Sequence, residues 1–132
     1  MTINNIRDAI NNHSTRSAWD KGVKLYALEL IDQLEEAIDD GCFYEDDLTA
    51  PRVLSRGLLN GAEDWSHYSW GGCSLIYDSQ IAERLCSPSE FVRTRGGERR
   101  PNSREEWLDV QARALSQAAR WIVNAARTEA AA

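Results

Sequence analysis

Residues 17–40 carry a long apolar periodicity, and it limits the fold more than any other part of the sequence. Large apolar side chains recur there every three or four positions, so a helix would gather them on one stripe. They are Trp19, Val23, Tyr26, Ala27, Leu30, Ile31, Leu34 and Ile38. Gly41 follows, and glycine is a common helix stop because it adopts the left-handed conformation that closes the last turn. The sequence therefore predicts a long amphipathic helix over about residues 17–40.

A second periodicity near the end of the sequence predicts another long helix over about residues 104–127. It opens on Ser103-Arg104-Glu105-Glu106, which has the form of a capping box. Its apolar stripe is Trp107, Val110, Gln111, Ala114, Ala118, Trp121, Ile122 and Ala125.

Shorter elements are predicted before and between these helices. Residues 3–12 have the apolar spacing of a short helix. Thr49 as N-cap and Pro51 in the first turn predict another, which the turn formers Asn60 and Gly61 are expected to end.

Two further segments complete the prediction of a mainly α-helical fold. Residues 87–90 combine a capping serine, a first-turn proline and a capping-box glutamate, which predicts a short helix starting there. The Gly, Pro and Asn content of residues 94–102 predicts a loop. With 132 residues the chain is expected to form one compact helical domain, residues 1–132, in which short helices and loops join the two long helices.

Composition narrows the broad class of protein. With 42% hydrophobic and 27% charged residues, the chain has the make-up of a globular domain. It holds no apolar run near the roughly 20 residues that span a bilayer, so no membrane association is expected. Its start lacks the basic stretch and apolar core of a signal peptide. Cys42, Cys73 and Cys86 form no paired motif, which favours a reducing compartment and predicts a cytoplasmic protein.

The net charge of −6 is unevenly distributed. Residues 1–50 carry 4 basic and 11 acidic side chains, whereas residues 93–132 carry 8 basic and 5 acidic ones. Of the 15 basic residues, 13 are arginine, which favours bidentate pairing with carboxylates or phosphates. One interpretation is that the C-terminal arginines pair with N-terminal acids inside the fold.

The first candidate site is an acidic face on the predicted helix 17–40. Its acids lie opposite the apolar stripe and are Glu29, Asp32, Glu35, Glu36, Asp39 and Asp40, with Glu45, Asp46 and Asp47 just beyond. Such a face can steer the protein onto a basic groove in place of nucleic-acid phosphates. We take Asp32, Glu36, Asp39 and Asp40 as candidate partner-binding residues. The alternative is a solvated helix face that serves solubility.

The second candidate is the aromatic segment 64–74. Trp65, His67, Tyr68 and Trp70 are candidate partner-binding residues, because aromatic side chains often anchor protein interfaces. The alternative is a loop whose aromatic rings fill the core.

The same segment offers a competing function, a small cysteine-dependent enzyme. Cys73 would be the nucleophile, His67 the base and Asp64 its carboxylate. No signature of a known cysteine hydrolase surrounds them, and these residues would be a minimal, mixed ligand set for zinc. We therefore expect no catalytic activity, no metal and no cofactor.

The third candidate is an Arg-rich loop just before the last predicted helix. Arg95, Arg99, Arg100 and Arg104 suit an anion, because the free backbone donors at a helix N-terminus attract negative charge. An anion-sensing regulator is thus another alternative function. The structural alternative is that these arginines pair with acids inside the protein, either in the N-terminal half or nearby in the sequence. Direct DNA binding is not expected of so acidic a chain.

Part of the sequence, residues 65–115, resembles a group of small uncharacterised proteins carried on phages and integrative elements of gut bacteria. The resemblance is carried by Trp70-Gly71-Gly72-Cys73-Ser74-Leu75-Ile76-Tyr77-Asp78, by Ile81-Ala82-Glu83-Arg84-Leu85-Cys86 and by the stretch from Gly97 to Asp109. It covers about two fifths of the chain and implies a setting, with no activity for any residue. Small acidic proteins on mobile elements are often inhibitors of host defence, including anti-CRISPR and anti-restriction proteins. The expectation is a non-enzymatic inhibitor whose protein partner offers a basic nucleic-acid-binding surface.

Overall fold

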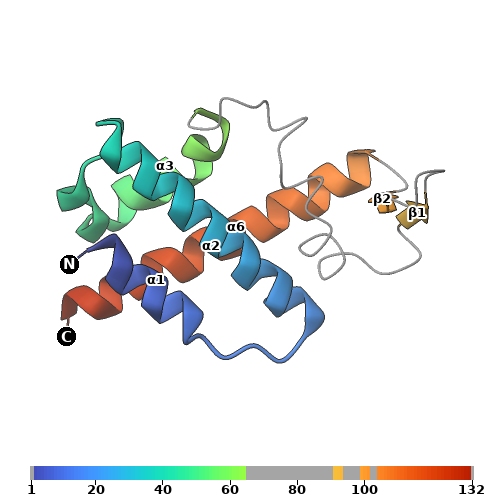
Figure 1. The fold of residues 1–132 in the computed structure, drawn as a ribbon, viewed down its shortest axis with the longest axis horizontal. Coiled ribbons are helices and arrows are strands. Elements are labelled where there is room, and N and C mark those ends of the chain that lie inside the picture. Colours follow the sequence, from blue (N-terminus) through green and yellow to red (C-terminus); the bar gives the residue numbers. More distant parts are fainter. Residues whose placement is uncertain (1, 65–90, 94–98, 102–103, 132) are drawn as a thin grey trace.

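The computed structural model describes residues 2–64, 91–93, 99–101 and 104–131, with side chains described for 2–59, 109–110 and 112–130. The described part is mainly helical, as predicted, and its helices pack together. They are α1 (Ile3–Asn11), α2 (Ala18–Asp39), the 3-10 helix η1 (Glu45–Thr49), α3 (Pro51–Asp64) and α6 (Arg104–Ala131). In Figure 1, α2 crosses α6, and α1 packs against the C-terminal half of α6.

Local signals fix both ends of α2. At its start, the Ser17 hydroxyl accepts a hydrogen bond from the backbone N–H of Asp20 at 3.0 Å. At its end, Gly41 has a φ of 77°, its N–H donates to the Ile38 carbonyl at 3.1 Å, and the Cys42 N–H donates to the Ala37 carbonyl at 2.8 Å. This pair of bonds is a Schellman motif, which satisfies carbonyls that the last turn leaves free. The predicted helix and its glycine stop are confirmed.

The core lies between the apolar stripe of α2 and an alanine-rich stripe of α6. Ala114 and Ala118 are fully buried there. The small side chains of α6 let its backbone approach α2 closely. The large side chains of α2 fill the space that remains between the two helices. One cluster of buried side chains draws on α1, α2, η1, α3 and α6, and its largest members are Tyr26, Ile6, Ile10, Leu30, Ile31, Leu34, Leu48, Leu54, Leu58 and Ile122.

The linker between α1 and α2 is fastened by a lysine. Lys24 Nζ donates to the backbone carbonyl oxygens of Asn11, at 2.6 Å, and of His13, at 3.1 Å. A cation at the end of α1 satisfies free carbonyls and complements the negative end of the helix dipole. This contact holds His13 beside the bundle.

The predicted limits of α3 are only partly right. Pro51 is its first residue, as expected. Thr49 is not its cap, because Thr49 is the last residue of η1 and its hydroxyl donates to the Asp46 carbonyl at 3.2 Å. Ala50 takes that position, and its carbonyl accepts from the Leu54 N–H. The helix also runs on to Asp64 without ending at residues 60 and 61, since neither Asn nor Gly forces a break where neighbouring residues continue the helix.

A β-hairpin replaces two of the predictions between α3 and α6. The strands β1 (Phe91–Arg93) and β2 (Arg99–Pro101) pair antiparallel, with Val92 opposite Arg100. The helix predicted from residue 87 therefore does not include residues 91–93, and the predicted loop 94–102 contains a strand. Phe91 and Val92 favour an extended backbone, and a pairing partner eight positions on in the sequence stabilises it.

The outer faces of the described helices are mostly polar. Large apolar side chains exposed within the described residues are Tyr44, at 69%, Val53, at 45%, and Leu59, at 39%. Among the described ranges, no helix combines the length and apolar character needed to cross a membrane.

Candidate functional site

Two acids of the predicted acidic face pair with an arginine of α1. Arg7 Nη2 lies 3.0 Å from Asp32 Oδ1, and Arg7 Nη1 lies 3.3 Å from Glu35 Oε2. Desolvation lowers the pKa of Arg7, but its hydrogen bonds and charge interactions with Glu35 and Asp32 together raise that pKa above its usual value. Asp32 thus helps to join α1 to α2, and its role in partner binding stays a prediction.

Five of the other acids follow one another closely in the sequence where α2 ends and η1 begins. Glu36, Asp39 and Asp40 are exposed, and so are Glu45 and Asp46 at the start of η1. We call these five residues the acidic patch. They surround the C-terminal end of α2, where the helix dipole adds partial negative charge. The sequence predicted Glu36, Asp39 and Asp40 as site residues; the structure shows them exposed and joined to η1 by the tight turn at Gly41.

An exposed aromatic side chain lies within the acidic patch. Tyr44 is 69% exposed, although its neighbour Phe43 is 7% exposed and Leu48 is fully buried. The Tyr44 carbonyl also accepts a hydrogen bond from the Asp47 N–H at 2.9 Å. Two buried anchors and the 3-10 turn therefore fix the backbone that presents the Tyr44 ring. Tyr44 was not predicted from the sequence, because two adjacent aromatic residues in a turn give no periodicity that would show which one is exposed.

The aromatic segment lies outside the described residues. Asp64 is the last residue of α3, and Trp65, His67, Tyr68, Trp70 and Cys73 follow it in the part that the structure does not describe. Their roles in partner binding or in cysteine chemistry stay predictions.

The Arg-rich loop is described only in part. Arg99 and Arg100 lie on β2, where the register pairs Arg99 with Arg93 of β1. Arg104 is the first residue of α6, as the predicted anion site requires. Arg95 lies outside the described residues, as do the side chains of the others. The anion site stays a prediction.

Arg113 of α6 does not follow the proposed pairing with N-terminal acids, and for the other C-terminal arginines that pairing stays a prediction. Arg113 Nε lies 3.3 Å from Asp109 Oδ2 of the same helix, and its guanidinium carbon lies 5.6 Å from the ring centre of Trp19. The indole N–H of Trp19 in turn donates to Gln117 Oε1 at 2.8 Å. This group ties the start of α2 to α6 by a cation–π contact and a hydrogen bond.

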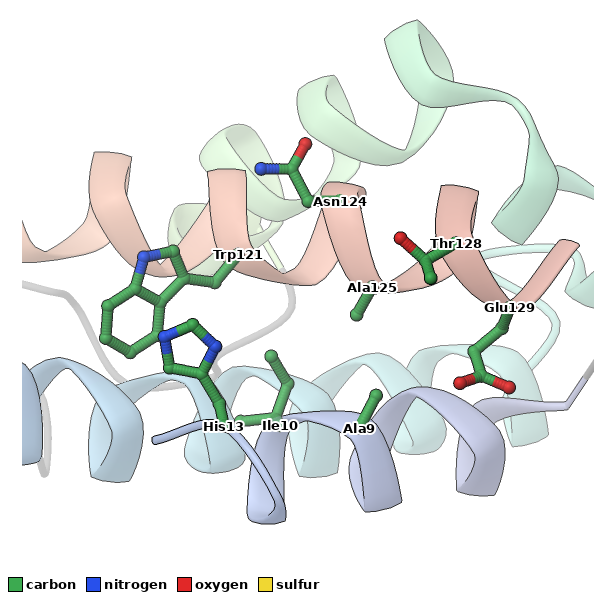
Figure 2. A pocket seen from close by; sticks show the side chains of 8 residues that line it. All are labelled: Ala9, Ile10, His13, Trp121, Asn124, Ala125, Thr128 and Glu129. Atoms are coloured by element: carbon green, nitrogen blue, oxygen red, sulfur yellow. The ribbon is translucent and has the colours of Figure 1, made fainter. Parts of the chain in front are cut away.

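A pocket of about 240 Å³ lies between α1 and the C-terminal half of α6. Figure 2 shows Ala9 and Ile10 pointing into it from α1, and Ala125 facing them from α6. At one end the rings of His13 and Trp121 stack, with centres 4.2 Å apart and planes tilted by 36°. Thr128 and Glu129 lie toward the other end, which therefore carries the polar groups.

Neither metal chemistry nor known relatives identify a function for these surfaces. Among the residues that the structure describes, no group of three His, Cys, Asp or Glu side chains is arranged to hold a metal ion. No protein-family model, no curated protein and no solved structure matches the chain.

Proposed function

We propose that the protein is a non-enzymatic binding module whose acidic patch and Tyr44 dock onto a basic surface of a partner protein. The observation that carries this proposal is the concentration of five exposed acids around an exposed tyrosine at one end of α2.

The electrostatics of the patch support a basic partner. Glu36, Asp39 and Asp40 lie within about one turn of α2, and neighbouring positions on a helix surface are roughly 5–6 Å apart. Like charges held so close repel one another. A cationic surface that approaches them is therefore attracted by each of the three carboxylates. The end of the helix dipole acts in the same direction.

Tyr44 supplies an aromatic anchor, which the charges of the patch do not provide. Charged rims of interfaces mainly set association rate and orientation, whereas buried aromatic anchors contribute most of the affinity. A fixed backbone also lowers the entropy lost when the ring is immobilised in a partner's pocket.

The chemistry of the patch also suggests what kind of surface the partner has. A surface built to bind nucleic acid is basic and offers flat or apolar slots for bases, which suits a patch of acids with one aromatic ring. The predicted aromatic loop, with Trp65, His67, Tyr68 and Trp70, would extend the same interface. We infer that the protein acts in the cytoplasm as an anti-defence inhibitor, of the anti-CRISPR or anti-restriction type that the resemblance to mobile-element proteins implies.

The test is charge reversal at the patch with a matched control. The variant Glu36→Lys/Asp39→Lys/Asp40→Lys moves the net charge from −6 to zero. The control Asp8→Lys/Asp109→Lys/Glu129→Lys makes the same change at exposed positions that are not part of the patch. Tagged wild-type protein and both variants are used to capture proteins from the host extract, which mass spectrometry identifies.

The proposal expects nucleic-acid-binding proteins to be captured by the wild type and by the control, to be lost with the patch variant, and to be displaced by added DNA or RNA. Capture by the patch variant as strong as that by the wild type would show that the patch is not the docking surface. Capture that survives excess nucleic acid would show that the partner's basic groove is not involved.

A further inference from the structure

The pocket between α1 and α6 joins an apolar cavity to a negatively charged end. Its middle is formed by Ala9, Ile10 and Ala125, and the stacked rings of His13 and Trp121 close one side. Figure 2 shows Asn124 pointing away from α1, whereas Thr128 and Glu129 lie at the end of the pocket opposite the His13 and Trp121 rings. A ligand with an apolar body and one polar end would match this arrangement.

The charge at the polar end has one sign. Glu129 lies in the last turn of α6, which ends at Ala131 and has no basic residue. The last carbonyl oxygens of a helix have no partner within it, and they carry the negative end of the helix dipole. Lys24 of α2 donates to the carbonyls of Asn11 and His13. A cation at Glu129 is therefore favoured by the carboxylate and by the helix end together.

The dimensions limit the size of the ligand. Trp121 and Glu129 are eight residues apart, which is about 12 Å along a helix. A volume of about 240 Å³ equals roughly eight water molecules at about 30 Å³ each. This is below the roughly 300–1,000 Å³ of most cofactor and drug-sized sites, so the pocket suits a small amine better than a nucleotide.

We propose that this pocket binds a small organic cation, a primary ammonium on an aryl or alkyl body, with the body between Ala9, Ile10 and Ala125 and the ammonium at Glu129. The aromatic wall at Trp121 favours an aryl body, because ring edges and faces pack well against indole. This site lies on different elements from the acidic patch, so it does not depend on the proposed function.

The test is a nuclear magnetic resonance titration of the full-length, ¹⁵N-labelled chain with 2-phenylethylamine, which is protonated at neutral pH. We expect saturable shifts at the amides of Ala9, His13, Ala125 and Glu129 and at the Trp121 indole N–H. The neutral 2-phenylethanol and the anionic 3-phenylpropionate have bodies of similar size and serve as matched ligands. We expect the alcohol to bind about five-fold more weakly and the acid not to bind.

Two variants and one control locate the site. Ala9→Leu fills the cavity with a good helix former and should remove the saturable shifts. Glu129→Gln, which keeps the size of the side chain, should weaken binding about five-fold. Asp8→Asn removes an exposed acid of α1 outside the pocket lining and should change nothing. Equal binding of the alcohol or acid, unchanged binding to either pocket variant, or shifts confined to the acidic patch would each overturn the proposal.

Discussion

Gly41 decides where α2 ends and where the patch begins. Its φ of 77° lies in the left-handed region, and a Cβ built there would meet no atom within 4 Å. The cost of a side chain is therefore conformational and not steric. We expect Gly41→Ala to lower the free energy of unfolding by about 1 kcal/mol, measured by urea denaturation. Asp40→Ala is the control, because Asp40 has a φ of −84° that alanine adopts without strain, and it should cause no loss. An equal effect of both substitutions would contradict this account.

Tyr44 is expected to matter for binding and not for stability. Because 69% of the residue is exposed, removing its ring takes little from the core. We expect Tyr44→Ala to change the free energy of unfolding by less than about 0.5 kcal/mol, but to weaken binding to the captured partner at least ten-fold, which is about 1.4 kcal/mol. Surface plasmon resonance measures the second value. Val53→Ala, at another exposed apolar position, should leave affinity unchanged. Wild-type affinity in the Tyr44 variant would show that Tyr44 does not anchor the interface.

Sequence predicted single residues best where the signal was local. Gly41 ended its helix as expected, since the left-handed residue acts through its own backbone. Thr49 misled because two helical turns meet there, and the sequence does not say which of them a capping residue serves. Tyr44 and Phe43 are adjacent aromatic residues with opposite burial. Only the packing of η1 against the core separates them.

The contact between α2 and α6 depends on small side chains along α6. Ala118 is fully buried, whereas Ala112 on the same helix is exposed. We expect Ala118→Leu to lower the free energy of unfolding by about 1–3 kcal/mol through overpacking. Ala112→Leu should change it by less than about 0.5 kcal/mol, since leucine and alanine are both good helix formers. Thermal and urea unfolding of the pair give the difference. Similar values for the two would mean that α6 does not approach α2 closely at Ala118.

At the scale of elements, periodicity predicted the helices and failed for the hairpin. The stripes of α2 and α6 repeat over many turns, so they remain visible despite single exceptions. The three-residue strands β1 and β2 stabilise each other across a gap in the sequence, and neither segment alone has a strand pattern. A capping motif at residues 87–90 then suggested a helix that residues 91–93 do not form. The pocket was also beyond sequence analysis, because it needs Ala9 and Ala125 to face each other across two helices.

In the folded protein, acidic residues that are neighbours in the sequence have different surroundings. Asp32 and Glu35 pair with Arg7 between α1 and α2, whereas the acids of the patch are exposed at and just beyond the C-terminal end of α2. On α6, Arg113 pairs with Asp109 of its own helix, while Arg120 and Arg127 are exposed. Negative charge is therefore concentrated at the acidic patch, and the net charge of −6 understates the local electrostatic field there.

That field predicts how binding should respond to salt. Raising the ionic strength from about 0.1 M to about 1 M shortens the Debye length from about 10 Å to about 3 Å. If the patch steers the protein to its partner, the association rate constant should fall by at least about ten-fold, with a much smaller change in the dissociation rate constant. Stopped-flow or surface plasmon resonance measurements on the captured partner give both constants.

The patch variant Glu36→Lys/Asp39→Lys/Asp40→Lys provides the critical comparison. Its association should be slow at low salt and nearly independent of ionic strength, because the steering charge has been reversed. The control reversed at Asp8, Asp109 and Glu129 has the same net charge and should keep most of the wild-type salt dependence. If both variants lose it equally, net charge and not the placement of acids at the end of α2 governs association, and the structural argument for the patch fails.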